Sequence, residues 1–312
     1  MDARELFSRI ARLPIAAEGL ATSMLSGSFR SAFRGQGMEF DEARHYQWGD
    51  DAKSIDWNAS TRLGTPFVKV YREERELSVL LLLDASASMR GGLARPWGRA
   101  PGDKGLSPYE QALLASALVA LSAERGGQRV GALLFDRGVG RAFPPRKGRR
   151  AAMAFLSEAL RIHSSPPPRP PARGASGGSD LRAAVSAAGR MLKRRSMVVV
   201  ASDFMSAGWE GEMGRLCRRH DVIAARVFDP AEGDPPDVGL VSAADPETGE
   251  RIAAPTGSPS FREAWAEWHG QKSELWRKSC RKAGAAALDL PVTADAAAAL
   301  ARFFGGRAGG GG

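Results

Sequence analysis

The feature that most constrains this chain is a short apolar run, Leu77 to Leu83, that ends at the carboxylate of Asp84. The run is far shorter than the roughly eighteen apolar residues that a membrane-spanning helix requires, and it predicts a strand that is buried on both faces. A strand of this kind belongs to a mainly parallel sheet that helices cover on both sides. Asp84 would then leave the carboxyl end of the strand, where open α/β sheets bind ligands.

Beyond Asp84, apolar runs rich in β-branched residues alternate with Ala- and Leu-rich stretches of helical spacing. This alternation predicts an α/β fold, a Rossmann-like sandwich of a mainly parallel sheet flanked by helices. One helix start is specific, because Ser107, Pro108 and Glu110 have the pattern of a capping box with proline at the first helical position. The expected strands cover residues 77–83, 130–135, 197–201, 222–228 and 285–290, and the expected helices cover residues 107–124, 151–162, 181–192, 261–282 and 295–304.

Changes in composition and residue pattern divide the chain into three parts. Residues 1–76 form an N-terminal accessory segment with two short helices at its start, residues 77–304 form the α/β domain, and residues 305–312 are a glycine-rich tail that we expect to be disordered. We expect Trp57 and Phe67 to anchor the accessory segment in the core of the main sheet. Loops are expected over residues 90–105 and over the proline-rich residues 164–176.

The chain is strongly basic, with 44 Lys and Arg against 35 Asp and Glu, a formal net charge of +9 and a pI near 10.0. Such a balance permits contact with nucleic acid or with an acidic protein surface. Most of the basic clusters lie in or next to predicted helices, where they are typical of solvated faces, and no aromatic stacking pattern accompanies them. Nucleic-acid binding therefore stays an alternative function. The clusters are Arg146–Arg150, Lys193–Arg195, Arg215–Arg219 and Arg277–Lys282.

The N-terminus and the cysteines indicate the cellular setting. Asp2, Arg4 and Glu5 interrupt the first apolar residues, so we expect no secretory signal and a cytoplasmic location. Cys217 and Cys280 stand outside any CxxC pattern, which argues against a disulfide framework and against a zinc site.

Two serines follow Asp84 at spacings that can direct oxygen atoms toward one point. Ser86 and Ser88 lie two and four residues after Asp84, so a curled loop would bring three hard oxygen donors together. Such donors favour Mg²⁺ or Mn²⁺ over zinc. The alternative is that the two serines only cap turns, as serines after strands often do.

The Asp-Ala-Ser-Ala-Ser sequence that begins at Asp84 resembles the metal-ion-dependent adhesion site of von Willebrand factor A domains. In that family a threonine of a second loop and an aspartate of a third loop complete the ligand set. The resemblance implies that Ser179, in the Gly-Gly-Ser-Asp-Leu stretch before a predicted helix, fills the threonine position and that Asp203 is the third-loop aspartate. It also implies that an Asp or Glu of a partner protein replaces a water on the ion.

A second motif lies in the accessory segment, where the stretch from Gly35 to Tyr46 leads into Gly-Asp-Asp at Gly49 and Ile-Asp-Trp at Ile55. This stretch resembles the domain-of-unknown-function-58 family, DUF58. Members of that family are thought to act with MoxR-type AAA+ ATPases as chaperone-like or maturation modules, so the resemblance implies such an ATPase as the partner. Taken alone, the acidic and arginine residues form either a charge-paired turn or a binding surface. The signature residues are Arg44, Tyr46, Gly49, Asp50, Asp51, Asp56 and Trp57.

Patterns typical of catalysis are missing from the sequence. The four histidines stand beside no nucleophile motif, and the chain has no phosphate-binding glycine loop with lysine. A phosphatase of the haloacid dehalogenase type would need a second aspartate two residues after Asp84, where Ser86 stands. We therefore expect a metal-dependent protein–protein interaction module and not an enzyme, with a metal-dependent hydrolase as the weakest alternative.

Overall fold

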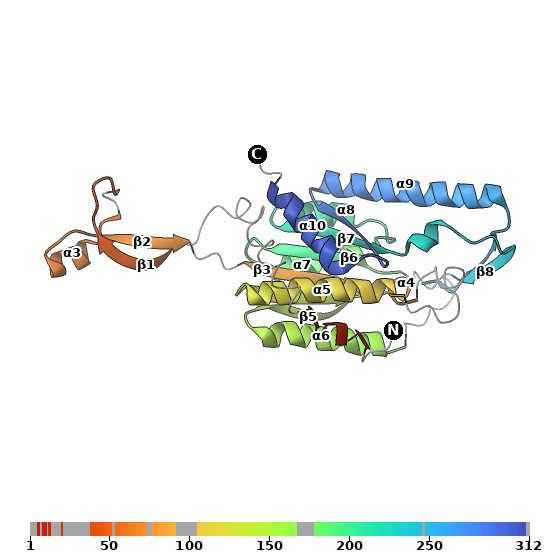
Figure 1. Cartoon of the computed structure of the whole chain (residues 1–312), viewed down its shortest axis with the longest axis horizontal. Helices are drawn as coiled ribbons and strands as arrows, with labels where there is room; N and C mark the ends of the chain where they lie inside the picture. The colour runs from red at the N-terminus through yellow and green to blue at the C-terminus, as the bar shows by residue number, and fades with distance from the viewer. Residues whose placement is uncertain are drawn as a thin grey trace. The chain divides into compact units, whose positions relative to one another are not determined.

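A computed structural model of the chain separates it into two units, Ser31–Glu76 and the remainder (Figure 1). The described residues before Ser31 group with the larger unit, and Leu6, Ile10 and Leu20 among them are buried. The accessory segment expected over residues 1–76 is thus divided between the two units. The described residues are 5, 6, 8–10, 12, 13, 20, 38–51, 54–73, 77–91, 105–166, 178–244 and 247–309.

The larger unit is built on a six-stranded sheet with the strand order β10-β7-β6-β3-β4-β5. All neighbouring strands run parallel except β5, which is antiparallel to β4. The mainly parallel sheet predicted from the sequence is confirmed, and the apolar run before Asp84 is its inner strand β3. The strands are β3 (Ser78–Asp84), β4 (Arg129–Phe135), β5 (Val139–Arg146), β6 (Met197–Ser202), β7 (Asp221–Phe228) and β10 (Ala286–Pro291).

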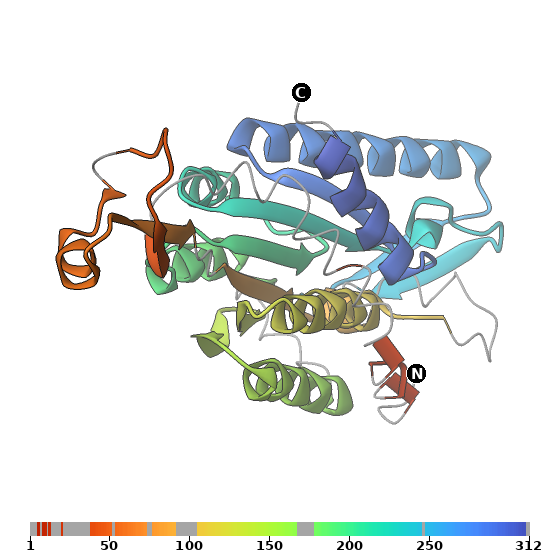
Figure 2. The ribbon, with the colours of Figure 1, turned by 60° about the vertical axis from the view of Figure 1, so that its left-hand side comes forward.

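Helices cover both faces of this sheet (Figures 1 and 2). Helices α5, α6 and α10 lie on one face, and α7, α8 and α9 lie on the other. The capping box predicted for α5 is present, because Ser107 Oγ accepts a hydrogen bond from the Glu110 N–H at 3.2 Å and a Glu110 oxygen accepts one from the Ser107 N–H at 2.6 Å. The helices are α4 (Ala87–Gly91), α5 (Pro108–Arg125), α6 (Arg149–Ser164), α7 (Leu181–Met191), α8 (Glu210–Cys217), α9 (Pro259–Ala283) and α10 (Ala296–Gly309).

Strand β3 is buried along nearly its whole length because its alternating side chains fill two core layers. Leu80 and Leu82 belong to the layer that includes Trp276 of α9. Leu81 and Leu83 are also fully buried and, by the two-residue period of a strand, face the opposite layer. This packing fixes the end of the strand, and with it the position of its last residue, Asp84.

The smaller unit is a two-stranded antiparallel sheet with a short helix between its strands, β1 (Met38–His45), α3 (Trp57–Leu63) and β2 (Phe67–Glu73). Trp57 is 69% exposed and so belongs to no core of its own unit, whereas the anchoring of Trp57 and Phe67 in the main sheet stays a prediction. The reason for the exposure is local, because Asp56 caps α3 and thereby places Trp57 in the first turn of a helix that buries none of its residues.

The C-terminal segment also differs from the prediction. Helix α10 continues to Gly309, so the expectation of disorder from residue 305 is wrong for the residues described there. Phe304 is buried, and Arg307 forms an ion pair with Asp221 at 2.8 Å. These two contacts hold the last turns against the domain despite their glycines.

Other elements had no clear pattern in the sequence. Strand β5 is an exposed edge strand that contains two prolines, a composition that edge strands tolerate but that obscures the strand pattern. A separate hairpin consists of β8 (Leu240–Ala244) and β9 (Arg251–Pro255). Most of the two loops expected before α5 and α7 lies outside the described residues. Within the described part of the chain, no helix is both long enough and apolar enough to cross a membrane.

Candidate metal centre

Asp84 is the last residue of β3 and is fully buried at the carboxyl edge of the sheet. Its Oδ1 accepts a hydrogen bond from the backbone N–H of Ser86 at 2.9 Å, and its Oδ2 accepts one from the hydroxyl of Ser202 at 2.6 Å. Ser202 ends the neighbouring strand β6, whose register brings it beside Asp84. Sequence reasoning missed Ser202, although its place directly before Asp203 was a usable signal.

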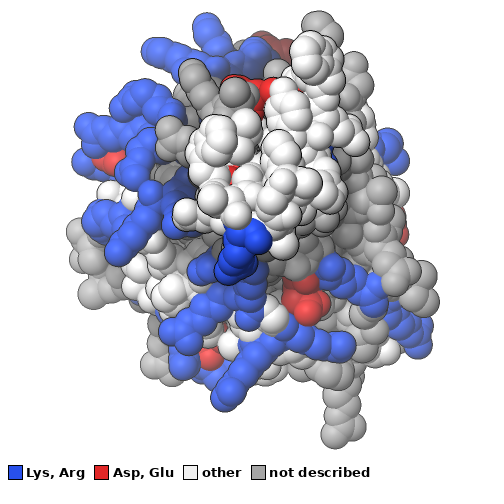
Figure 3. All heavy atoms as spheres, turned by 90° about the vertical axis from the view of Figure 1, so that its left-hand side faces the viewer, with Lys and Arg blue, Asp and Glu red and all other residues white. Residues whose placement is uncertain are grey.

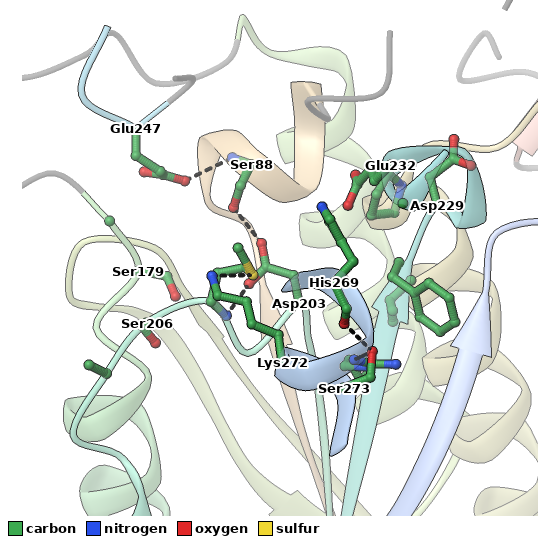
Figure 4. Close-up of a pocket in the computed structure, with 18 of the residues that line it drawn as sticks. Ser88, Ser179, Asp203, Ser206, Asp229, Glu232, Glu247, His269, Lys272 and Ser273 are labelled. Atoms are coloured by element: carbon green, nitrogen blue, oxygen red, sulfur yellow. Dashed lines mark hydrogen bonds between the residues drawn. The ribbon is translucent and has the colours of Figure 1, made fainter. Parts of the chain in front are cut away.

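Hydroxyl groups link the loop after β3 to the loop after β6 (Figure 4). The Oγ atoms of Ser86 and Ser88 are 3.1 Å apart, and Ser88 Oγ donates to Asp203 Oδ2 at 2.7 Å. The structure therefore brings together four of the five predicted ligands, Asp84, Ser86, Ser88 and Asp203. We call these four residues the oxygen cluster.

A left-handed backbone turn holds Asp203 in this position. Phe204 has a φ of 56°, a conformation that costs a residue with a side chain about 1 kcal/mol or more. Two hydrogen bonds support it, from the Phe204 N–H to Ser202 Oγ at 3.1 Å and from the Met205 N–H to Asp203 Oδ1 at 3.0 Å. The buried Phe204 ring packs edge-on against Trp209 with centroids 5.3 Å apart. Core packing thus offsets the strain of the turn.

Burial dominates the electrostatics of the oxygen cluster. It raises the pKa of Asp84 to about 7, and the nearby charge of Asp203 adds to this rise. Burial also raises the pKa of Asp203, whereas the hydrogen bonds from Ser88 and Met205 oppose the rise. Two carboxylates held this close repel each other when both are ionised. A cation bound beside them would stabilise the doubly ionised state.

The oxygen cluster borders a cavity of about 760 Å³ whose wall includes Ser88 and Asp203. Lys272 of α9 extends into it (Figure 4). Its Nζ lies 4.0 Å from the centroid of the Trp268 ring. Burial lowers the pKa of Lys272 and raises that of Glu232 to about 7. The cavity therefore carries groups of both signs, and no pattern in the sequence pointed to the side chains from α9.

Two further side chains with oxygen atoms line the same cavity. Ser179 precedes α7, and within the described residues no hydrogen bond joins it to the oxygen cluster, so the structure places it at the cavity but not in contact with the four others. Glu247 follows strand β8, and its Oε1 accepts a hydrogen bond from the backbone N–H of Ser88 at 2.8 Å. Sequence reasoning missed Glu247, because only the fold brings its loop to the cluster.

The donors of the oxygen cluster fit Mg²⁺ or Mn²⁺. They are two carboxylates and two hydroxyls, and hard oxygen donors are the ligands that these cations prefer. Among the described residues, no group of three or more His, Cys, Asp or Glu side chains is placed so that it could hold a metal ion. A cation here would therefore depend on the serine hydroxyls as well as on the two carboxylates.

Comparison with known families gives a match over most of the chain. The family described as "Protein of unknown function DUF58" matches residues 42–274. The chain belongs to this family. The DUF58 match begins within β1 and ends within α9, so it includes the whole oxygen cluster and the smaller unit's signature.

Several known proteins resemble this DUF58 protein over much of its length. An uncharacterized protein of Mycobacterium tuberculosis is 30% identical over 308 residues, which cover 98% of this chain and 91% of the relative, and a Mycobacterium bovis protein matches equally. Among solved structures, BatB from Bacteroides thetaiotaomicron is 15% identical with a TM-score of 0.39, covering 74% of this chain and 98% of that one. An aerotolerance-related membrane protein from Bacteroides fragilis is 17% identical with a TM-score of 0.43, covering 72% and 94%.

The DUF58 signature residues build turns in the smaller unit. Arg44 forms two hydrogen bonds to the carboxylate of Asp50, at 2.7 and 2.9 Å, and they hold the pKa of Asp50 below its usual value. Gly49 adopts a φ of 104°, which favours glycine. These contacts support the charge-paired turn over a binding surface. Among the other signature residues, the Tyr46 N–H donates a hydrogen bond to the Pro66 carbonyl, and the Asp51 carbonyl accepts one from the Ser54 N–H. Asp56 caps α3, and Trp57 is exposed.

Proposed function

We propose that this DUF58 protein is a metal-dependent protein-interaction module and not an enzyme. In this proposal the larger unit is a von Willebrand factor A-type domain whose oxygen cluster holds Mg²⁺ or Mn²⁺. A partner's Asp or Glu side chain completes the coordination of the ion. By family resemblance the partner is a MoxR-type AAA+ ATPase, which we expect the protein to meet in the cytoplasm.

The hydrogen bond from Ser88 to Asp203 is the observation that carries this proposal. The two residues are 115 positions apart in the sequence, and their contact joins the loops after β3 and β6 at 2.7 Å. Asp84 lies beneath them, buried and close enough to Asp203 for charge repulsion. Serines that only capped turns of their own loop would not need a hydrogen bond to the carboxylate of Asp203 in another loop. The geometry therefore favours a ligand set that both loops share.

Glu247 supports the idea that the loop accepts an acidic side chain. Its carboxylate already bonds to the backbone of Ser88, and it comes from a distant part of the chain. An acidic side chain of a partner would approach the same loop. Glu247 would then compete with the partner for the exposed side of the oxygen cluster.

Copurification of the tagged protein with its MoxR-type ATPase, in Mg²⁺ and in EDTA, tests this function. We expect retention in Mg²⁺, loss in EDTA, and loss in Ser88→Ala because a donor oxygen is missing. Ser206→Ala is the matched control, since the Ser206 oxygen is buried yet makes no hydrogen bond within the described chain. Glu247→Gln should increase retention. Equal retention with and without Mg²⁺ in the wild type would refute the proposal.

A further inference from the structure

The topology gathers basic side chains from four separate stretches of sequence on one edge of the larger unit. We call these side chains the basic edge. All of them are exposed, whereas most Lys and Arg that line the cavity are partly buried. The basic edge consists of Arg146, Lys147, Arg149, Arg150, Lys193, Arg194, Arg195, Arg218, Arg219, Lys278, Arg281 and Lys282.

Strand direction places all four stretches at the same edge. The ends of α7, α8 and α9 each lead directly into the parallel strands β6, β7 and β10, so the basic residues there lie at the amino ends of those strands. Strand β5 is antiparallel, and its last residue Arg146 pairs with Val130 at the start of β4. The basic edge is therefore opposite to the carboxyl edge that carries Asp84. Figure 3 views the molecule from this side, and the Lys and Arg that it draws, which include those of the smaller unit, greatly outnumber Asp and Glu.

Helix ends alone do not explain so many cations. A positive side chain stabilises the carboxyl end of a helix, but this effect is confined to the last turn. One or two basic residues per helix are enough to provide it. Neighbouring cations such as Lys193 and Arg194 repel each other instead. Two acidic side chains of α8 and β7 have partners of their own, since Glu212 pairs with Arg215 at 2.5 Å and Asp221 pairs with Arg307 at 2.8 Å.

The chemistry of the surface indicates which polyanion it fits. Among the exposed large apolar side chains described for the larger unit, only Leu275 adjoins the basic edge, one helical turn before Lys278 on α9, and no exposed aromatic ring of that unit does so. Bases of single strands stack on aromatic rings, protein interfaces use apolar or aromatic anchors, and peripheral membrane proteins usually add an apolar or lipid anchor to basic residues. The phosphate backbone of a duplex needs only positive donors, and guanidinium groups bind phosphate in bidentate fashion.

The length of the row agrees with this partner. The members of the basic edge lie at the amino ends of β10, β7 and β6 and at the end of β5, with none at β3 or β4 between them. Adjacent strands are about 4.8 Å apart, so the two groups together reach over on the order of 24 Å. That length can follow several successive phosphates of a duplex. We propose that the basic edge binds the phosphate backbone of double-stranded nucleic acid without reading its sequence. This inference is independent of the proposed metal-dependent function.

Binding of the full chain to a short mixed-sequence DNA duplex, measured by fluorescence anisotropy over a series of salt concentrations, tests the proposal. We expect affinity to fall steeply with salt and to be equal for unrelated duplex sequences. Arg194→Glu combined with Arg218→Glu should weaken binding at least tenfold and lower the salt slope by about two. The matched control is Arg182→Glu combined with Arg251→Glu, which changes net charge equally at exposed positions outside the basic edge. The control should bind within about twofold of the wild type.

Three results would overturn the proposal. One is no duplex binding by the wild type at low salt, and another is an equal loss in the control, which would mean that net charge alone attracts the duplex. The third is binding to phosphatidylglycerol vesicles without binding to the duplex, which would assign the surface to a membrane. Melting curves of both double variants check folding, and removal of repelling cations should leave the first variant at least as stable as the wild type.

Discussion

At the scale of single residues, Ser88 is the side chain on which the candidate metal centre depends, because its hydroxyl contacts both Ser86 and Asp203. We expect Ser88→Ala to weaken Mg²⁺ binding about tenfold, since one donor oxygen is worth roughly 1 kcal/mol or more. Asp203→Ala should abolish measurable binding while raising the melting temperature in EDTA, because the repulsion with Asp84 disappears. Isothermal titration calorimetry and melting curves would measure these effects. Unchanged Mg²⁺ affinity in both variants would show that the cluster is a purely structural turn.

His220 gives a second residue-scale prediction, on stability and pH. It is buried, and neither ring nitrogen has a partner among the described residues, so burial and then the charges of Arg219 and Arg195 lower its pKa to about 4. The unfolded chain binds this proton near pH 6.5, so the stabilising contribution is complete above that pH and is lost as the pH falls toward 4. The loss is on the order of 3 kcal/mol at most.

Urea unfolding of His220→Leu and the wild type at neutral pH and near pH 5 would measure this contribution. The wild type should lose more free energy of unfolding on acidification than the variant does. His45→Gln, which replaces an exposed histidine, is the control and should leave the acid response of the wild type unchanged. An identical acid response of the wild type and His220→Leu would contradict the assignment.

At the scale of elements, the start of α5 carries a complete capping box. Ser107→Ala should lower the free energy of unfolding by about 1 kcal/mol, because it leaves the Glu110 N–H without its acceptor in a buried position. Ser258 caps α9 with a longer hydrogen bond, 3.4 Å from its Oγ to the Phe261 nitrogen. Ser258→Ala should therefore lower the free energy of unfolding by only about a few tenths of a kcal/mol. Chemical denaturation of both variants would compare them. A larger loss for Ser258→Ala would indicate that the length of the capping hydrogen bond does not set the stabilisation by these caps.

At the scale of the whole molecule, the inner strand β3 supports both core layers and the metal loop. Leu82 is fully buried in the layer beneath α7, α8 and α9. Leu82→Ala should therefore cost about 2 to 5 kcal/mol and lower the melting temperature of the larger unit as a whole. Leu275→Ala, at a side chain that is 63% exposed, should change stability by less than about 0.5 kcal/mol. Calorimetry would test the pair, and a mild effect of Leu82→Ala would mean that the core repacks around the gap.

Most elements of the larger unit could be predicted from the sequence alone, because their signals are local, whereas β5, β8, β9 and α8 could not. The apolar run before Asp84 predicted β3, and the Ser107 capping box predicted the start of α5 to the residue. Asp84, Ser86 and Ser88 followed from their spacing, whereas Ser179 and Asp203 were found only through the resemblance to a known family. The exposed position of Trp57 and the length of α10 were missed, because burial depends on neighbours that the local sequence does not contain.

Which distant residues come into contact depends on the long-range packing of the fold. Parallel strand order brings Ser202 to Asp84 and Asp203 to Ser88, and a hairpin loop brings Glu247 to the same loop. The basic edge arises in the same way, because each parallel strand starts at the edge where the preceding helix ends. A local pattern fixes the direction and type of an element, but the order of strands in a sheet depends on long-range packing. For this reason both candidate binding surfaces became visible only in the folded chain.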